Sequence, residues 1–208
     1  MSQLICDQNF ESDILPWVSG QLTFVRSATN KINGSYSLRG GNGTAADGYG
    51  YITLATADRR WNGSARGLRF QASFLLKIVT QPSGCDIVVL RGQSSIGGTQ
   101  GILSVADGGT KLKGMDATLG ATSLGATAHR IEIDYSESGK HPTINAVSAA
   151  RQIVRLDGAV ELDISAPSSG IGVSGYLSGF WAGVSIGGKG IWEAVWDDMR
   201  IWLASDPT

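Results

Sequence analysis

The sequence predicts an all-β fold, an antiparallel two-sheet sandwich, and three observations carry this prediction. Apolar and polar residues alternate with a period of two through several segments, and nearly every such segment is bounded by Gly, Asn or Asp. Glycine accounts for 29 of the 208 residues, roughly twice its average usage, which indicates many tight turns. The spacing of these segments leaves no room for the crossover helices that a parallel sheet requires.

The clearest strands lie in the middle of the chain. Between Leu68 and Val79, apolar residues such as Phe70 and Phe74 alternate with residues that are mostly polar, which predicts a long strand with one face on a core. The segment from 130 to 135 has the same pattern with a fully polar outer face. Shorter strands are predicted at Leu22 to Val25, Tyr36 to Leu38, Tyr51 to Leu54, Asp86 to Arg91, Ile102 to Val105, Ile153 to Leu156, Val160 to Ile164, Ile171 to Val173, Ala182 to Ile186 and Val195 to Leu203.

Dipeptides typical of turns separate these strands. Asp157-Gly158 predicts a hairpin, and we interpret the Asn-Gly pairs that begin at Asn33, Asn42 and Asn62 as turns as well. Only residues 146–151 have a weakly helical pattern, which fits an exposed strand equally well.

Composition bounds the domain count and the classes of partner. No low-complexity linker divides the chain, so we expect one jelly-roll domain over residues 1–208. A formal net charge of −1 provides no global electrostatic field that would attract a nucleic acid.

Every apolar stretch is shorter than the ~18 to 20 residues of a membrane span. The first residues lack the pattern of a secretory signal, so we expect synthesis in the cytosol and two reduced cysteines, Cys6 and Cys85.

Taken together, the strands and the two ends of the chain resemble the concanavalin A-like, laminin-G-like jelly roll of lectins, carbohydrate-binding modules and glucanases. The resemblance implies that the first and last strands are neighbours in one sheet. It is carried by Asn9-Phe10-Glu11 with Trp17, by Gly34 to Leu38, by Phe70 to Ile78, by His129 to Tyr135 and by Trp196 to Trp202.

Jelly-roll domains without an export signal resemble structural proteins of tailed bacteriophages, which decorate capsids, attach to tails or baseplates, or bind host glycans. This resemblance implies a non-catalytic virion protein, and we favour capsid decoration over tail attachment as its role. Its partner would be the major capsid protein or another virion protein, and it would form a homo-oligomer. The alternative is a lectin-like module of the tail or baseplate that binds a carbohydrate of the host surface.

A third hypothesis is a glucan hydrolase that retains anomeric configuration. Residues 132–137 resemble the Glu-x-Asp-x-x-Glu signature of such enzymes, which implies that Glu132 is the nucleophile, Asp134 a tuning residue and Glu137 the acid/base. On a regular strand, however, Glu137 faces away from the other two unless a bulge intervenes. Because Ser136 also departs from the family pattern, we expect a solvated polar face rather than a catalytic site.

The last strand carries one set of binding candidates. Trp196, Asp198, Arg200 and Trp202 are predicted to alternate with an apolar face that packs in the core. Two tryptophans beside a charged pair suit a carbohydrate platform or a subunit interface, whereas the remaining alternative is that both rings pack under loops of the same domain.

A second set is the cluster of Arg59, Arg60, Trp61 and Arg66, in a predicted loop. Arg and Trp are enriched at interface hot spots, so the cluster could dock onto an acidic protein partner, and a solvated loop is the alternative. We expect no metal and no cofactor, because the acidic and histidine residues lack the spacing of metal ligands and no Gly-rich phosphate-binding loop occurs.

Overall fold

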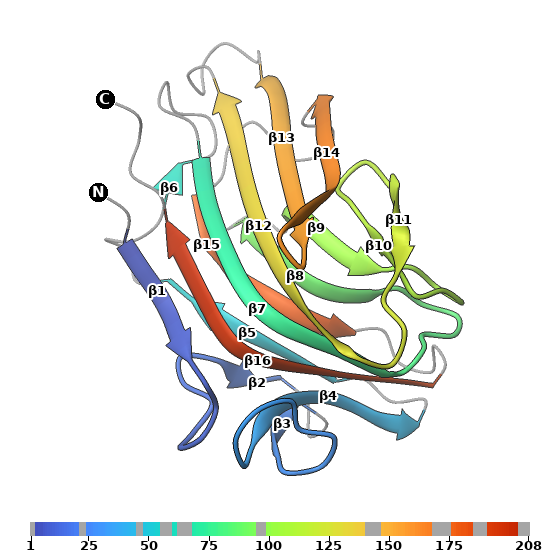
Figure 1. The fold of residues 1–208 in the computed structure, drawn as a ribbon. Coiled ribbons are helices and arrows are strands. Elements are labelled where there is room, and N and C mark those ends of the chain that lie inside the picture. Colours follow the sequence, from blue (N-terminus) through green and yellow to red (C-terminus); the bar gives the residue numbers. More distant parts are fainter. Residues whose placement is uncertain are drawn as a thin grey trace.

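A computed structural model of the chain describes residues 3–20, 24–44, 48–54, 60–61, 68–94, 99–139, 147–167, 176–184 and 191–203 (Figure 1). These residues form two antiparallel sheets of eight strands each, which confirms the predicted all-β jelly-roll sandwich. In this part of the chain there is no helix with the length and apolarity of a membrane span.

The first sheet contains the longest strands. They are β1 (Gln3–Gln8), β3 (Val25–Ser27), β4 (Ser37–Thr44), β7 (Leu68–Thr80), β12 (Ala128–Gly139), β13 (Val147–Leu156), β14 (Ala159–Pro167) and β16 (Trp192–Leu203). The strand order is β14-β13-β12-β7-β16-β4-β3, and β1 pairs with β16 (Figure 1). The first and last strands are therefore neighbours, as the resemblance implied.

The second sheet packs against the first. Its strands are β2 (Val18–Ser19), β5 (Gly48–Thr53), β6 (Arg60–Trp61), β8 (Ile87–Ser94), β9 (Thr99–Val105), β10 (Lys111–Lys113), β11 (Leu119–Ser123) and β15 (Tyr176–Val184). The strand order is β11-β10-β9-β8-β15-β5-β2, and β6 pairs with β15. Both sheets alternate inward apolar and outward polar residues, so a sandwich core forms between them.

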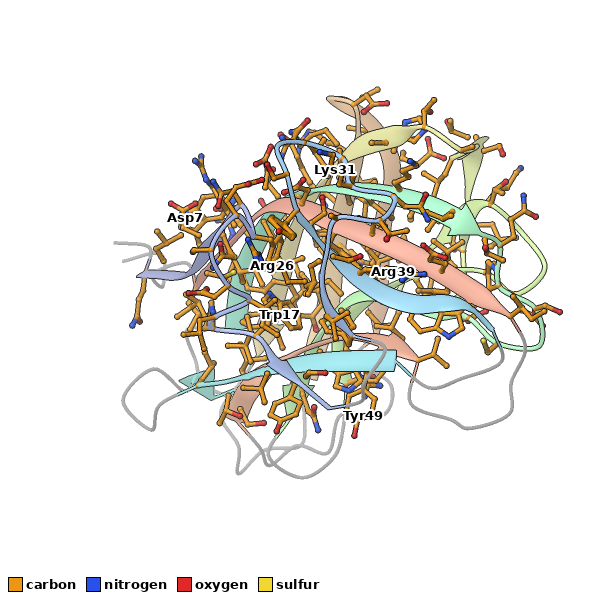
Figure 2. The ribbon with its side chains drawn as sticks, turned by 90° about the horizontal axis from the view of Figure 1, so that it is seen from below. Asp7, Trp17, Arg26, Lys31, Arg39 and Tyr49 are labelled. Carbon is orange, nitrogen blue, oxygen red and sulfur yellow. The ribbon has the colours of Figure 1, made fainter. Side chains whose placement is uncertain are left out.

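The core is rich in aromatic rings that bridge the two sheets. Phe70 of β7 and Phe180 of β15 are both fully buried, and their rings meet edge to face with centroids 5.1 Å apart. Trp17 is buried 5.9 Å from the ring of Phe24, and Figure 2 shows Trp17 between the layers. Such rings contribute the largest buried apolar areas in a sandwich, so they dominate its cohesion.

The predicted hairpin at Asp157-Gly158 is confirmed. Both residues have positive φ, 52° and 86°, as a two-residue turn between twisted strands requires, and they join β13 to β14. The described part of the ambiguous segment 146–151 lies in β13, so the strand alternative is the correct one.

The three Asn-Gly pairs have different outcomes. Gly34 follows Asn33 in an irregular segment and has a φ of 56°, in agreement with a turn. Asn42 lies inside β4, so the turn predicted there is wrong: cross-strand pairing with β16 overrides the local preference. Asn62 lies outside the described residues.

The segment before β4 is tied to the N-terminal part of the chain by Glu11. One carboxylate oxygen of Glu11 accepts hydrogen bonds from the backbone N–H groups of Ser35, at 2.8 Å, and Tyr36, at 3.2 Å. These two donors stabilise the ionised carboxylate and lower the pKa of Glu11 below its ordinary value.

We predict that Glu11 makes the free energy of unfolding depend on pH in the acidic range. Its lowered pKa stabilises the folded state above the ordinary glutamate pKa, and this contribution is lost as the pH falls through the folded-state value. Denaturant unfolding of the wild type and Glu11→Gln should therefore give a difference in unfolding free energy at pH 7 that shrinks at pH 3. A difference that stays constant with pH would contradict this assignment.

Candidate functional site

The two outer faces of the sandwich each carry a hollow. The first-sheet hollow has a volume of about 670 Å³ and is lined by Asp7, Gln8, Asn9, Ser73, Arg130, Glu132, Asp198, Arg200 and Trp202. The second-sheet hollow has a volume of about 430 Å³ and is lined by Tyr49, Tyr51, Ile52, Thr53, Gln93, Ser178, Gly179 and Trp181. The first lining is rich in charged side chains, and the second holds aromatic and neutral polar residues.

The first-sheet hollow brings together three of the predicted binding residues, Asp198, Arg200 and Trp202. Its charges largely compensate one another. The Nε of Arg200 lies 3.0 Å from a carboxylate oxygen of Asp7, and a terminal nitrogen of Arg130 lies 3.7 Å from the Asp198 carboxylate. Trp202, which is partly buried, is the one aromatic residue of this lining.

Trp196 does not join this hollow, which contradicts its prediction as a surface residue. It is fully buried, and its indole N–H donates a 3.0 Å hydrogen bond to the carbonyl of Val89. The reason is a bulge in β16: the pairing with β7 shifts register between Asp197 and Arg200, and Asp198 has a φ of 45°. The bulge exchanges the two faces of the strand, so residues on both sides of it point into the core.

Asp197 stabilises the bulge from the covered side of β16. Its carboxylate is 1% exposed and accepts hydrogen bonds from the Asn33 backbone, at 2.9 Å, the Ser37 hydroxyl, at 2.8 Å, and the Asp198 backbone, at 2.8 Å. Burial raises the pKa of Asp197 although these donors oppose the shift. The segment before β4 therefore covers this part of the sheet.

The residues of the glucan-hydrolase hypothesis lie along β12. The pairing of β12 with both β7 and β13 keeps an unbroken register from Glu132 to Glu137, so the bulge that this hypothesis needs is absent from that stretch. Glu132 lines the first-sheet hollow, whereas both carboxylate oxygens of Asp134 are held by Arg69 at 3.0 and 2.6 Å. The backbone at position 137 therefore continues the regular alternation of the strand.

Half of the predicted Arg/Trp cluster can be placed. Arg60 and Trp61 form β6, where they pair with Leu177 and Tyr176 of β15. A short strand therefore occurs where a loop was expected. Arg59 and Arg66 lie outside the described residues.

The second-sheet hollow is built on β5 and β15. In β5, Gly48, Gly50 and Ile52 face the core, which leaves Tyr49 and Tyr51 on the outer face. Tyr51 is the cross-strand partner of Trp181, and the rings of Tyr49 and Trp181 stack with centroids 5.5 Å apart and an interplanar angle of 22°. Three aromatic residues thus gather on one side of the hollow, and Figure 2 shows Tyr49 at the outer side of β5.

Trp181 packs against the other side chains of this group and contributes little exposed surface to the hollow. It is only 5% exposed, because Tyr49 stacks against its ring and the guanidinium carbon of Arg91 lies 4.3 Å from its centroid. Both tyrosines are partly exposed, so a ligand can reach part of each side chain, although the Tyr49 ring also lies over Gly20.

Neutral polar groups line the other side of the hollow. Thr53 is exposed, and the Gln93 side-chain amide has no hydrogen-bond partner within the described part of the chain. The Ser178 hydroxyl donates to the Gln93 carbonyl at 3.0 Å, which ties β15 to β8. The described lining contains no carboxylate, histidine or cysteine.

Arg91 lies beside this hollow and is electrostatically isolated. Its guanidinium has no hydrogen-bond or ion-pair partner among the described residues, and its Nε atom is buried. No Asp, Glu, Lys or His occurs in β5, β8 or β15. Burial lowers the pKa of Arg91. A buried donor without a partner costs about 1–3 kcal/mol, so the Arg91 Nε atom lowers the stability of the fold as it stands.

Glycines allow β15 to approach β5 closely. A Cβ atom at Gly179 would lie 2.0 Å from the Ile52 carbonyl oxygen, and one at Gly183, where φ is 108°, would lie 2.1 Å from the Gly48 carbonyl oxygen. No larger residue fits without moving the backbone of β5, which carries both tyrosines of the hollow.

We predict that Gly179→Ala destabilises the protein by about 1–3 kcal/mol, because the new methyl group overpacks the β5–β15 pair. Gly109→Ala is the matched control, since its Cβ would meet its nearest atom at an ordinary 3.6 Å, and its effect should stay within about 0.5 kcal/mol. Urea unfolding of both variants measures the difference. Equal stability of the two variants would refute the close-approach argument.

Sequence reasoning missed the second-sheet hollow. The sequence analysis predicts a strand at Tyr51 to Leu54 but makes no prediction for Trp181. The available signal was the Gly-Tyr-Gly-Tyr alternation of residues 48–51, which puts two tyrosines on one face of a strand. That Trp181 lies beside them depends on the strand order, which local patterns do not specify.

Known structures share this fold. The cellulose-induced protein Cip1 is 13% identical, with a TM-score of 0.58, and the alignment covers 94% of this chain and 96% of that one. A carbohydrate esterase from Shiga toxin-encoding bacteriophage phi24B is 7% identical, with a TM-score of 0.56 and coverage of 91% and 90%. The CBM2 module of the evolved Dit of Lactobacillus casei BL23 phage J-1 is 13% identical, with a TM-score of 0.51 and coverage of 100% and 98%. No protein-family model and no curated protein matches the sequence.

Proposed function

We propose that this protein is a non-catalytic carbohydrate-binding module of a tailed-bacteriophage particle, and that it binds a host-surface glycan in the second-sheet hollow. The observation that carries the proposal is the group of Tyr49, Tyr51 and Trp181 beside the polar side chains of Thr53 and Gln93.

This arrangement has the two components that sugar recognition needs. A pyranose ring presents C–H groups on its faces, which pack against aromatic rings, and hydroxyl groups on its rim, which require directional partners. The partly exposed tyrosines supply the first component, and the amide of Gln93 and the hydroxyl of Thr53 supply the second. Trp181 holds Tyr49 in place, so the binding surface is formed before the ligand arrives.

The first-sheet hollow suits a glycan less well. Arg200 and Arg130 are already engaged by Asp7 and Asp198, so a sugar would have to compete with ion pairs. It also offers Trp202 alone as a ring for stacking. Trp202 therefore provides a control position on the opposite sheet.

The structural neighbours support a place in a phage particle. The phage J-1 CBM2 module aligns over nearly the whole length of both chains, and a second neighbour is a bacteriophage carbohydrate esterase. We favour the tail or baseplate over capsid decoration, because a glycan-binding surface serves attachment to the host. On this proposal the protein is located in the virion, forms a homo-oligomer and is held by another virion protein.

The proposed glycan-binding role predicts a strong effect of Tyr51→Ala. Loss of a stacking ring should weaken binding about tenfold or more on the glycan that a glycan array identifies, measured by calorimetry. Trp202→Ala, on the other sheet, should bind as the wild type does. Binding to no glycan, or a loss confined to Trp202→Ala, would contradict the proposal.

The non-catalytic part of the proposal has its own test. The described lining of the second-sheet hollow holds no carboxylate or histidine for general acid–base chemistry, and β12 lacks the bulge that would turn Glu137 toward Glu132. Incubation with β-glucans and with the bound glycan should therefore release no new reducing ends. Turnover by the wild type that Glu132→Gln lacks would restore the hydrolase hypothesis.

A further inference from the structure

Arg91 is the one charged residue of the three strands that form the second-sheet hollow. On the outer face of the first sheet, Arg69 is held by Asp134 at 2.6 Å and Arg151 by Asp163 at 2.9 Å, whereas Arg155 of β13 has no such partner among the described residues. Arg91 has neither a carboxylate nor a carbonyl partner among the described residues, and β5, β8 and β15 contain no acidic residue. The second sheet therefore presents a positive charge that the described residues do not compensate.

The position of Arg91 connects this charge to the hollow. Arg91 is the cross-strand partner of Trp181, and its guanidinium lies over the Trp181 ring, which also stacks with the ring of Tyr49. Gln93, two residues further along β8, lines the hollow itself. Two residues of a strand span roughly 7 Å. A sugar chain bound on the tyrosines can therefore extend over Arg91 with its next unit.

We infer that the glycan bound in the second-sheet hollow is acidic, and that Arg91 binds a carboxylate carried by one of its sugar units. This inference rests on the proposed glycan-binding function and deepens it by naming the class of ligand.

The chemistry of the guanidinium favours a carboxylate over a neutral hydroxyl group. Its planar fork of N–H donors matches the two oxygens of a carboxylate, and such charge-assisted pairs are stronger than neutral hydrogen bonds. The cation–π contact with Trp181 restrains the Arg91 side chain before binding, so less side-chain freedom is lost when a ligand binds. Because the Nε atom is buried, the carboxylate would pair with the terminal nitrogens of the guanidinium, which no described carboxylate engages. An acidic ligand meets no repelling carboxylate on β5, β8 or β15.

The test compares matched pairs of glycans that differ only in charge. An array is printed with uronate- and sialate-containing oligosaccharides beside their carboxyl-reduced counterparts, and is probed with the wild type, Arg91→Gln and Arg155→Gln. Arg155 is the matched control, because it is a partly buried arginine of β13 on the opposite sheet and also has no partner among the described residues. Thermal unfolding establishes that each variant is folded.

We expect the wild type and Arg155→Gln to bind acidic members at least tenfold more tightly than their carboxyl-reduced counterparts, and Arg91→Gln to lose this preference. Preferential binding of neutral members, or an acidic preference that survives in Arg91→Gln, would overturn the inference and leave glycan binding intact. Binding of no member would overturn both the inference and the proposed function.

A second measurement needs no variant. The affinity of the wild type for its best acidic glycan should fall as the salt concentration rises from 0.05 to 0.5 M, whereas its weaker affinity for the carboxyl-reduced counterpart should stay unchanged. The same salt dependence for both members of the pair would count against a carboxylate contact at Arg91.

Discussion

The candidate site depends on the close approach of β15 to β5, which only glycine permits at positions 179 and 183. This approach places Trp181 against the two tyrosines of β5, since cross-strand neighbours must be close for their rings to stack. The same strand pairs with β8 on its other side, where it brings Arg91 onto the Trp181 ring. The strand β15 therefore brings together the aromatic residues of the hollow and the charged Arg91 beside it.

The two outer faces of the sandwich have different electrostatic designs. On the first sheet, several arginines pair with carboxylates of neighbouring strands, as Arg69 does with Asp134, so many of its charges are compensated. On the second sheet the hollow combines rings and neutral polar groups, and the charge of Arg91 lies beside it on the Trp181 ring. A surface whose charges compensate one another suits solvent or a protein neighbour, whereas a hollow with rings and unpartnered polar groups suits a ligand.

Much of the fold could be predicted from local pattern, and the site could not. Period-two alternation located β7 and β12, and Asp157-Gly158 located a hairpin, because both signals act within a few residues. Trp196 was predicted on the wrong face because the bulge beside it is fixed by the burial of Asp197, a long-range contact with Asn33. The grouping of Trp181 with the tyrosines likewise arises from strand order, which no local pattern encodes.

The most direct test of the account is a nuclear magnetic resonance titration of the labelled protein with the glycan that binds most tightly. The account predicts that backbone amide shifts change along β5, β8 and β15 and that the Trp181 indole N–H signal moves with them. Changes confined to β1, β7, β12 and β16 would place the ligand in the first-sheet hollow and contradict it.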